Sequence, residues 1–195
     1  MSVRTLVCKI RARLSGFSAR LRRDSAGFAA VEFALIVPVM IIMLLGVVET
    51  CEALSVDLRV ITIANSTSLL VARCDNITNG ELEDVLRISD SLLGKYSSDP
   101  LRVQIVALHA DAQGVVTVSW SYDRSGGEPY VAGASFPDAP PGLVPSNASA
   151  VVSVASYRYA SPIGRFIHGA ITLKHPGYQA TRFANIVKGT TKCTW

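Results

Sequence analysis

The residues whose types and spacing could do chemistry lie at one boundary near the N-terminus. A basic stretch that ends in Arg22 and Arg23 closes on Gly27, and a long apolar run begins at Phe28 with one acid, Glu32, at its fifth position. A charge inside a membrane segment costs roughly a few kcal/mol, so it is a functional candidate by default. A cut after Gly27 would give Phe28 a free amine. This positively charged amine could pair with Glu32 of a neighbouring subunit if the two helices are offset along their axes. The alternative is that the Glu32 side chain extends to the membrane interface within its own subunit.

Elsewhere the reactive side chains show no arrangement typical of an active site. The three histidines, His109, His168 and His175, lack the i, i+4 spacing of a helical metal site. The sequence also contains no G-x-S-x-G, P-loop or G-x-G-x-x-G motif. We therefore predict no enzyme activity, no cofactor and no metal site, although a tethered hydrolase assembled from distant residues remains a third interpretation.

The element that must position Glu32 is an apolar helix. Phe28 to Val48 is a run of twenty-one residues with one charge, and a helix of that length spans roughly 30 Å, the thickness of a bilayer core. A buried soluble helix is the first alternative, and a cleaved secretory signal with A-x-A spacing is the second. Glu49 and Thr50 do not fit such a signal, and they also disfavour lipoprotein processing at Cys51.

The net charge of +4 is unevenly distributed and predicts the orientation of the chain. Residues 1–27 carry seven basic side chains against Asp24 alone, whereas residues 28–195 carry twelve basic and fourteen acidic side chains. The positive-inside rule keeps the basic leader in the cytoplasm and exports the residues from about 50 onward. Because the basic pI belongs to the leader, it does not indicate nucleic-acid binding by the folded part.

At this boundary the sequence resembles a known family. The run Gly27-Phe28-Ala29-Ala30-Val31-Glu32-Phe33-Ala34-Leu35-Ile36-Val37-Pro38 is similar to the signature of TadE/TadF-like proteins, the pseudopilins of tight-adherence (Flp) pilus systems. The strong resemblance covers roughly residues 22–54. Larger relatives carry a von Willebrand-type domain with a D-x-S-x-S metal motif, which the segment Asp123-Arg124-Ser125-Gly126-Gly127 does not complete.

The resemblance implies a role, a processing site and partners. It implies cleavage between Gly27 and Phe28 by a prepilin peptidase, with Glu32 and its neighbour Phe33 as candidate assembly residues. The implied partners are that peptidase, the pilus assembly platform, other pilins or pseudopilins and inner-membrane lipid. The implied location is the bacterial inner membrane with a periplasmic head, and the protein either stays there or enters the pilus.

After the membrane span the sequence predicts an α+β fold. The first helix is expected to continue to residue 75, with a core-facing stripe of Val47, Cys51, Leu54, Leu58, Ile61, Asn65, Ser68 and Ala72. Thr78 and Glu81 have capping-box spacing for a second helix whose apolar face is Leu82, Val85, Leu86 and Leu93, with a stop at Gly94.

Strands follow, and we expect them to form a small antiparallel sheet packed on the first helix. Residues 101–109 and 115–122 flank the turn signal Asp111-Ala112-Gln113-Gly114, and residues 150–159 predict a third strand. Residues 123–149 read mostly as loop, and residues 163–173 fit a strand or a helix equally. The predicted organisation is a leader (1–27), a long helix (28–75, with 28–48 transmembrane) and an exported α+β head (76–195).

Three cysteines lie on the exported side, where disulfides persist, whereas Cys8 lies in the leader. Cys51 and Cys74 are twenty-three residues apart on one predicted helix, or about 34 Å, which exceeds the roughly 4.4–6.8 Å between the α-carbons of a disulfide. Cys74 with Cys193 is therefore the favoured pair, and Cys51 with Cys193 is the alternative.

These features together predict a structural function. The chain is expected to be a pilin-like minor subunit or assembly factor in the biogenesis of a tight-adherence pilus. The alternative is a membrane-tethered exported binding module whose helix is only an anchor, and processing after Gly27 distinguishes the two.

Overall fold

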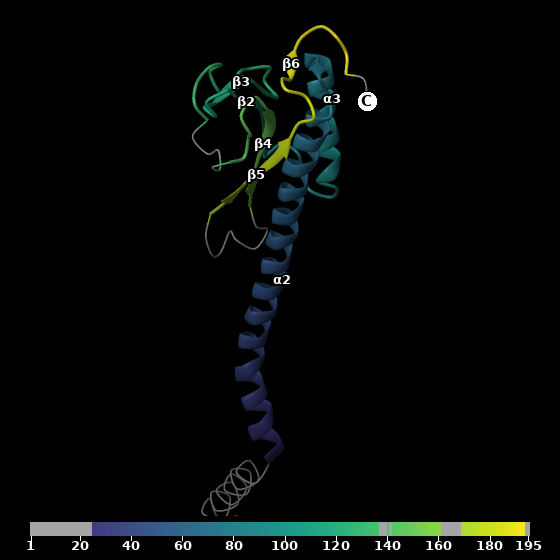
Figure 1. Ribbon diagram of the computed structural model, residues 1–195. Helices are drawn as coiled ribbons and strands as arrows, with labels where there is room; N and C mark the ends of the chain where they lie inside the picture. The colour runs from purple at the N-terminus through teal and green to yellow at the C-terminus, as the bar shows by residue number, and fades with distance from the viewer. Residues whose placement is uncertain (1–24, 137–139, 141, 161–168, 194–195) are drawn as a thin grey trace, which may run out of the picture. The chain divides into compact units, whose positions relative to one another are not determined.

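The structure of the chain is a computed structural model that describes residues 25–136, 140, 142–160 and 169–193. The chain divides into two compact units, Met1–Thr50 and Cys51–Trp195, and the helix α2 (Ser25–Ala72) contributes residues to both. The described elements form the predicted α+β fold, in which a long N-terminal helix precedes and packs on a small antiparallel sheet (Figure 1).

In the first unit, α2 is apolar on all sides and its side chains are exposed. By length and composition alone, the helix from Gly27 onward is suited to cross a membrane, and none of its most apolar window is buried by the protein. Exposed side chains include Phe28, Leu35, Ile42 and Met43, each more than 60% accessible. A helix that is apolar all round needs an apolar environment, which is either a membrane or other protein chains.

In the second unit, α2 buries only part of the predicted stripe. Ser68 and Ala72 are buried as predicted, whereas Leu54 and Leu58 are 57% and 64% exposed, and Asn65 is also exposed. The other buried side chains of the helix are Val56, Val60, Ile63, Ala64, Thr67 and Val71. Both sets recur at steps of three and four, so periodicity alone does not choose between them. The earlier part of the predicted stripe was wrong because it followed Leu54 and Leu58, whereas the packed face uses Val56, Val60 and Ile63.

A sheet of four antiparallel strands lies against this face, in the order β3-β2-β4-β5. The strands are β2 (Leu101–Ala110), β3 (Val116–Asp123), β4 (Ser149–Tyr159) and β5 (Ile171–Ala180). The predicted hairpin and third strand are confirmed, with bounds within one residue. Of the segment left open between strand and helix, residues 163–168 lie outside the described residues, and β5 begins at Ile171 and continues to Ala180.

Both faces of the sheet are covered, and alternate residues of β2 face opposite clusters. Val103 and Ile105 join the cluster with α2 and α3, whereas Val106 and Leu108 join a second cluster on the other face. Phe136, from the connection between β3 and β4, is 4% exposed and contributes to that second cluster. The segment predicted as loop therefore serves as the cover of the second face.

The second helix, α3 (Asn79–Leu92), begins and ends as predicted. Thr78 and Glu81 form the reciprocal capping box, and Gly94 takes a positive φ of 65° just beyond the helix. Leu82, Val85, Leu86 and Leu93 are buried, as expected from their spacing. Figure 1 shows α3 alongside the C-terminal part of α2. The buried hydroxyls of Thr67 and Ser89 join the two helices at 2.9 Å.

The C-terminal segment closes the second unit. Its strand β6 (Val187–Lys188) pairs in parallel with β1 (Asn76–Ile77), which follows α2 directly. Ile186 is 1% exposed, and its carbonyl accepts a hydrogen bond of 2.8 Å from the indole nitrogen of Trp120. The segment is therefore part of the core of the unit.

The helix and the sheet approach each other most closely at Gly177 of β5. A β-carbon added at Gly177 would lie 2.4 Å from the backbone carbon and oxygen of Ala64. Its cross-strand neighbour Ser153 is fully buried, and the Ser153 hydroxyl has no hydrogen-bond partner among the described residues. Small residues on both sides thus allow the α2 backbone to rest on the sheet.

Substitution of Gly177 by alanine is expected to lower the free energy of unfolding by about 1–3 kcal/mol, because the added methyl group would force the helix and the sheet apart. Chemical denaturation of the full chain in detergent, followed by the fluorescence of buried Trp120, measures this change. Gly80→Ala is the matched control, because a β-carbon at that helical position meets nothing within 4 Å. Equal stability of the Gly177→Ala and wild-type chains would contradict the close approach.

Candidate functional site

The predicted processing and assembly residues lie on one exposed stretch of α2 in the first unit. Phe28 and Phe33 are 76% and 67% exposed, and Glu32 is exposed between them. The bond between Gly27 and Phe28 lies within the described part of α2, which is helical from Ser25 onward.

Packing does not require glycine at position 27. A β-carbon there would meet no heavy atom within 4 Å, and Gly27 is not among the glycines with positive φ. Glycine inside a helix costs roughly 0.5–1 kcal/mol relative to alanine. A costly residue without a role in the fold of its own chain is expected to serve recognition by another molecule.

Glu32 likewise makes no stabilising contact within the part of its own chain that the structure describes. No hydrogen bond or ion pair joins its carboxylate to any other residue that the structure describes. Glu32 is exposed, as are the nearby apolar residues Phe28, Phe33 and Leu35. Any partner for this carboxylate must come from outside the described part of the chain.

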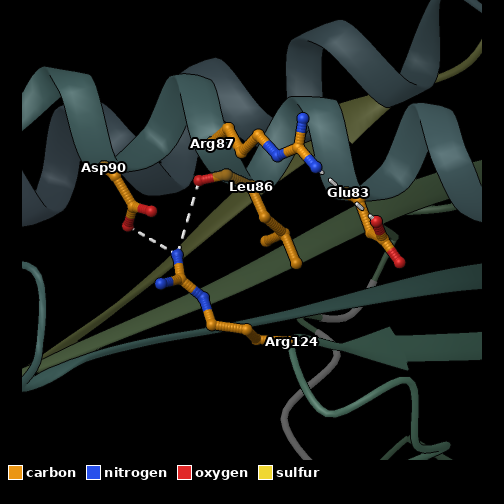
Figure 2. A pocket seen from close by; sticks show the side chains of 5 residues that line it. All are labelled: Glu83, Leu86, Arg87, Asp90 and Arg124. Carbon is orange, nitrogen blue, oxygen red and sulfur yellow. Dashed lines mark hydrogen bonds and ion pairs between the residues drawn. The ribbon is translucent and has the colours of Figure 1, made fainter.

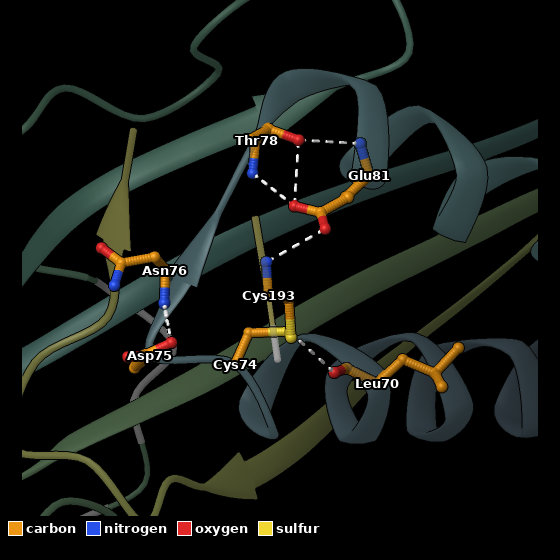
Figure 3. The surroundings of a disulfide bond; sticks show 7 residues. All are labelled: Leu70, Cys74, Asp75, Asn76, Thr78, Glu81 and Cys193. Carbon is orange, nitrogen blue, oxygen red and sulfur yellow. Dashed lines mark hydrogen bonds between the residues drawn. A yellow bond between two sulfur atoms is a disulfide. The ribbon is translucent and has the colours of Figure 1, made fainter. Parts of the chain in front are cut away.

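In the second unit, Cys74 and Cys193 form a disulfide with an α-carbon separation of 5.2 Å (Figure 3). This is the pair that the helical spacing favoured, and Cys51 is free and exposed. The bridge closes a loop of 119 residues, which the chain-entropy model values at roughly 5 kcal/mol. It links the end of α2 to the C-terminal segment.

Glu81 connects the N-terminal cap of α3 with the C-terminal segment beside the disulfide (Figure 3). One carboxylate oxygen accepts from the backbone N–H of Thr78 at 2.9 Å, and the other accepts from the N–H of Cys193 at 3.0 Å. The hydrogen bond from the Thr78 backbone is the main cause that lowers the pKa of Glu81. A lowered carboxyl pKa stabilises the fold above the unfolded-state value, and this contribution is lost as the pH falls through the folded-state value.

A second polar cluster joins α2 to the end of α3. Glu52 accepts hydrogen bonds from Lys95, at 2.8 Å, and from the Tyr96 hydroxyl, and these bonds lower the pKa of Glu52. Arg59 lies over the Tyr96 ring and donates to the Leu92 carbonyl at 3.1 Å. The cluster fixes the first turns of α2 in the second unit against α3.

The shallow hollow of about 250 Å³ beside α3 is a structural contact (Figure 2). Arg124, just after β3, points at α3 and pairs with Asp90, and it also contacts the Leu86 carbonyl. Arg87 pairs with Glu83 and Asp84 on the same helix. Because these charges satisfy one another, the hollow does not offer an unpaired group to a ligand.

Asp123 begins the segment that does not complete the D-x-S-x-S metal motif, and its carboxylate stabilises a turn. Its carboxylate accepts from the backbone N–H groups of Ser125 and Gly127 and from the Ser125 hydroxyl, whose bond is the largest cause of the lowered pKa of Asp123. Among the described residues, no three His, Cys, Asp or Glu side chains gather as a metal site.

Sequence reasoning missed the contacts that join distant segments. The Nε2 atom of His175 in β5 lies 2.6 Å from the Oδ1 atom of Asp57 in α2, although the two residues are 118 positions apart in the sequence. Glu52, Arg59 and Gly177 were likewise not singled out. The residues next to a charged or histidine side chain in the sequence do not indicate which other helix or strand it will contact. The sequence therefore does not predict these pairs.

Comparison with known families shows that residues 27–66 match the family described as TadE-like protein. This finding confirms the resemblance at the N-terminal boundary. The match begins at Gly27 and covers most of α2, and it includes neither α3 nor the strands. No curated protein and no solved structure matches the chain.

Reduction of the Cys74–Cys193 bridge is expected to lower the free energy of unfolding by roughly 2–5 kcal/mol, since it releases the longest loop constraint in the second unit. Tryptic mapping of the non-reduced chain should link the peptide that begins at Cys74 with the one that begins at Cys193. Cys51→Ser is the control and should change neither the link nor the stability. A link between Cys51 and Cys193 would contradict the structure.

Proposed function

We propose that the chain is a pilin-like subunit or assembly factor of a tight-adherence pilus, processed after Gly27 and anchored by α2 in the bacterial inner membrane. The observation that carries this proposal is the TadE-like match over residues 27–66, which connects the chain with the pilus system. The match begins at the residue that would precede the cut, and it contains the lone carboxylate of Glu32.

The remaining features support the same function. The apolar part of α2 suits a membrane, and the basic leader favours a cytoplasmic N-terminus by the positive-inside rule. The second unit then lies in the periplasm, which is an oxidising compartment where a disulfide such as Cys74–Cys193 persists. The partners are a prepilin peptidase, the assembly platform and other pilins.

The proposed mechanism uses Gly27 and Glu32, for which the described residues show no role in the fold. Removal of the leader frees the amine of Phe28, and the recognition of Gly27 by the peptidase explains a glycine where packing accepts any small residue. Glu32 of one subunit then pairs with the Phe28 amine of its neighbour. In a low-dielectric environment this attraction is stronger than at a surface, and it sets the stagger between adjacent helices.

The alternative function is a tethered binding module formed by the second unit. The family match ends at residue 66, so it does not cover most of this unit. Such a module needs α2 only as an anchor. It would keep its leader, because a membrane anchor works equally well with a basic cytoplasmic end. Processing therefore distinguishes the two functions.

Substitution of Gly27 by leucine is expected to abolish processing, because a bulky side chain would occupy the position that the peptidase reads. Mass spectrometry of the full-length protein from membranes of the native host should find Phe28 as the mature N-terminus in the wild type and the unprocessed leader in the variant. Gly46→Leu is a matched control, since a β-carbon at Gly46 also meets nothing within 4 Å. An unprocessed wild-type chain in piliated cells would refute the assignment.

Glu32→Val is expected to leave protein level, processing and the Cys74–Cys193 bridge unchanged and to reduce piliation by about tenfold or more, the effect of losing at least 1.4 kcal/mol per contact. Pili are counted in cells that lack the native copy. Glu32→Asp retains the carboxylate and should restore part of the piliation. Wild-type piliation with Glu32→Val would reduce Glu32 to a snorkelling residue.

A further inference from the structure

The outward side of α2 in the second unit carries no charge. From Cys51 to Ala72, seven residues of the helix are exposed, and none of them is acidic or basic. Leu54 is one of the seven, and the other six recur at alternating steps of four and three. We call these six the outward row: Cys51, Ser55, Leu58, Thr62, Asn65 and Leu69. The exposed face of a surface helix normally carries its charged residues, so this row is not typical of a face that meets only water.

The charged residues of this part of α2 lie on its other sides. Glu52 and Arg59 contact the end of α3, and Asp57 pairs with His175 of β5. All three charged side chains of α2 are only partly exposed. The helix thus directs its charges at contacts within the unit and leaves apolar and small side chains outside.

The hydroxyl groups of the outward row do not require water. Ser55 Oγ donates to the Cys51 carbonyl at 2.7 Å, and Thr62 Oγ1 donates to the Leu58 carbonyl at 2.8 Å. Because these donors are satisfied by their own helix, another helix can cover them without leaving a buried donor unpaired. Leu58 and Leu69 are 64% and 40% exposed, and their removal from water would favour such a contact.

The spacing of the outward row is that of two helices packed side by side. Alternating steps of four and three are the a and d spacing of a coiled coil, and the row extends over about 27 Å of helix. The side chain of Asn65 makes no hydrogen bond with a residue that the structure describes. Its amide has donors and an acceptor, so it can pair with its own copy, and a lone asparagine in a seam favours that register.

We propose that the outward row packs against the outward row of a second copy of this chain, as two parallel α2 helices in register. The inference rests on the proposed function for the membrane anchor, which gives all copies in one membrane the same orientation. It also holds the rows at the same height and raises the effective concentration of second copies. Each residue of the row then meets the same residue of the other copy.

A second copy explains the row better than other occupants do. In a symmetric pair every charged residue would meet a like charge, so a row without charge suits contact with itself. A different protein is normally selected through complementary charges, which the row lacks. Lipid chains would not satisfy the Asn65 amide. A helix has room for neighbours on several sides, so this in-register pair does not replace the offset contact through Glu32.

The first test is disulfide cross-linking of the full-length chain in phospholipid vesicles, with copper phenanthroline as the oxidant that takes the two electrons from a pair of thiols. Native Cys51 is one probe, and Leu58→Cys and Asn65→Cys are the others, each in a Cys51→Ser chain that keeps the Cys74–Cys193 bridge. These probes should form dimers at least about tenfold faster than Glu83→Cys in the same background. Glu83 is the matched control, because its side chain is 57% exposed on α3, outside the row. Equal rates at the control and the row would overturn the proposal.

Two differently tagged chains measure the register. One carries Leu58→Cys and the other Asn65→Cys, so that dimers of each kind can be separated. In-register helices should link each position to itself, with few mixed links, since the two positions are about 10 Å apart along the axis. Mixed links as abundant as the links between identical positions would overturn the in-register pair.

Charge variants at the centre of the row give the last measurement. Leu58→Lys should lower the yield of Cys51-linked dimer about tenfold, because two ammonium groups would meet. A mixture of Leu58→Lys and Leu58→Glu chains should restore most of the dimer as the mixed pair. Ile88→Lys is the matched control, since Ile88 is 48% exposed on α3. An equal loss with Ile88→Lys, or no recovery in the mixture, would overturn the proposal. Gly27 and Glu32 lie outside the row, so failure of the processing or piliation tests would leave these yields unchanged.

Discussion

The close approach of α2 to the sheet at Gly177 is the contact on which the second unit depends. It brings helix backbone against strand backbone, so only small side chains fit where Ala64, Ser153 and Gly177 meet. This contact decides which face of α2 is buried, and it turns Leu54 and Leu58 outward. The buried Ser153 hydroxyl makes no hydrogen bond with a described residue. Ser153 is small enough for the helix to approach, although its buried hydroxyl is left without a described partner. The need for a small side chain therefore outweighs the loss of a hydrogen bond at this contact.

The ends of α3 are tied to α2 by chemically different means. At its N-terminal end, Glu81 holds both the helix cap and the segment that carries Cys193. At its C-terminal end, Arg59 and Glu52 bind the Leu92 carbonyl, Lys95 and Tyr96. Because covalent, polar and apolar contacts act at separate points, loss of one leaves the helix pair aligned by the others. The second unit is therefore suited to present fixed surfaces to partners.

The sequence predicts elements wherever local signals mark their limits. The capping box at Thr78 and the glycine at position 94 define α3, and the turn at Asp111 defines the hairpin. It predicts only part of the buried face of α2, namely Ser68 and Ala72, because two stripes have the same period and the choice depends on Gly177, which lies over a hundred residues away. Nor does it predict the pair of Asp57 and His175, whose meeting follows from the position of β5 at the edge of the sheet. For the disulfide, helical rise excludes a bridge between Cys51 and Cys74, but it leaves both Cys74 and Cys51 as possible partners of Cys193, and the structure contains the favoured bridge from Cys74.

Two groups of residues are not explained by contacts among the described residues. Gly27 and Glu32 are unfavourable for a helix or a membrane, yet neither has a compensating contact among the described residues. The outward row of α2 carries no charged side chain, although every residue in it is exposed. Natural sequences agree with their own fold at most positions, so such departures indicate contacts made between molecules.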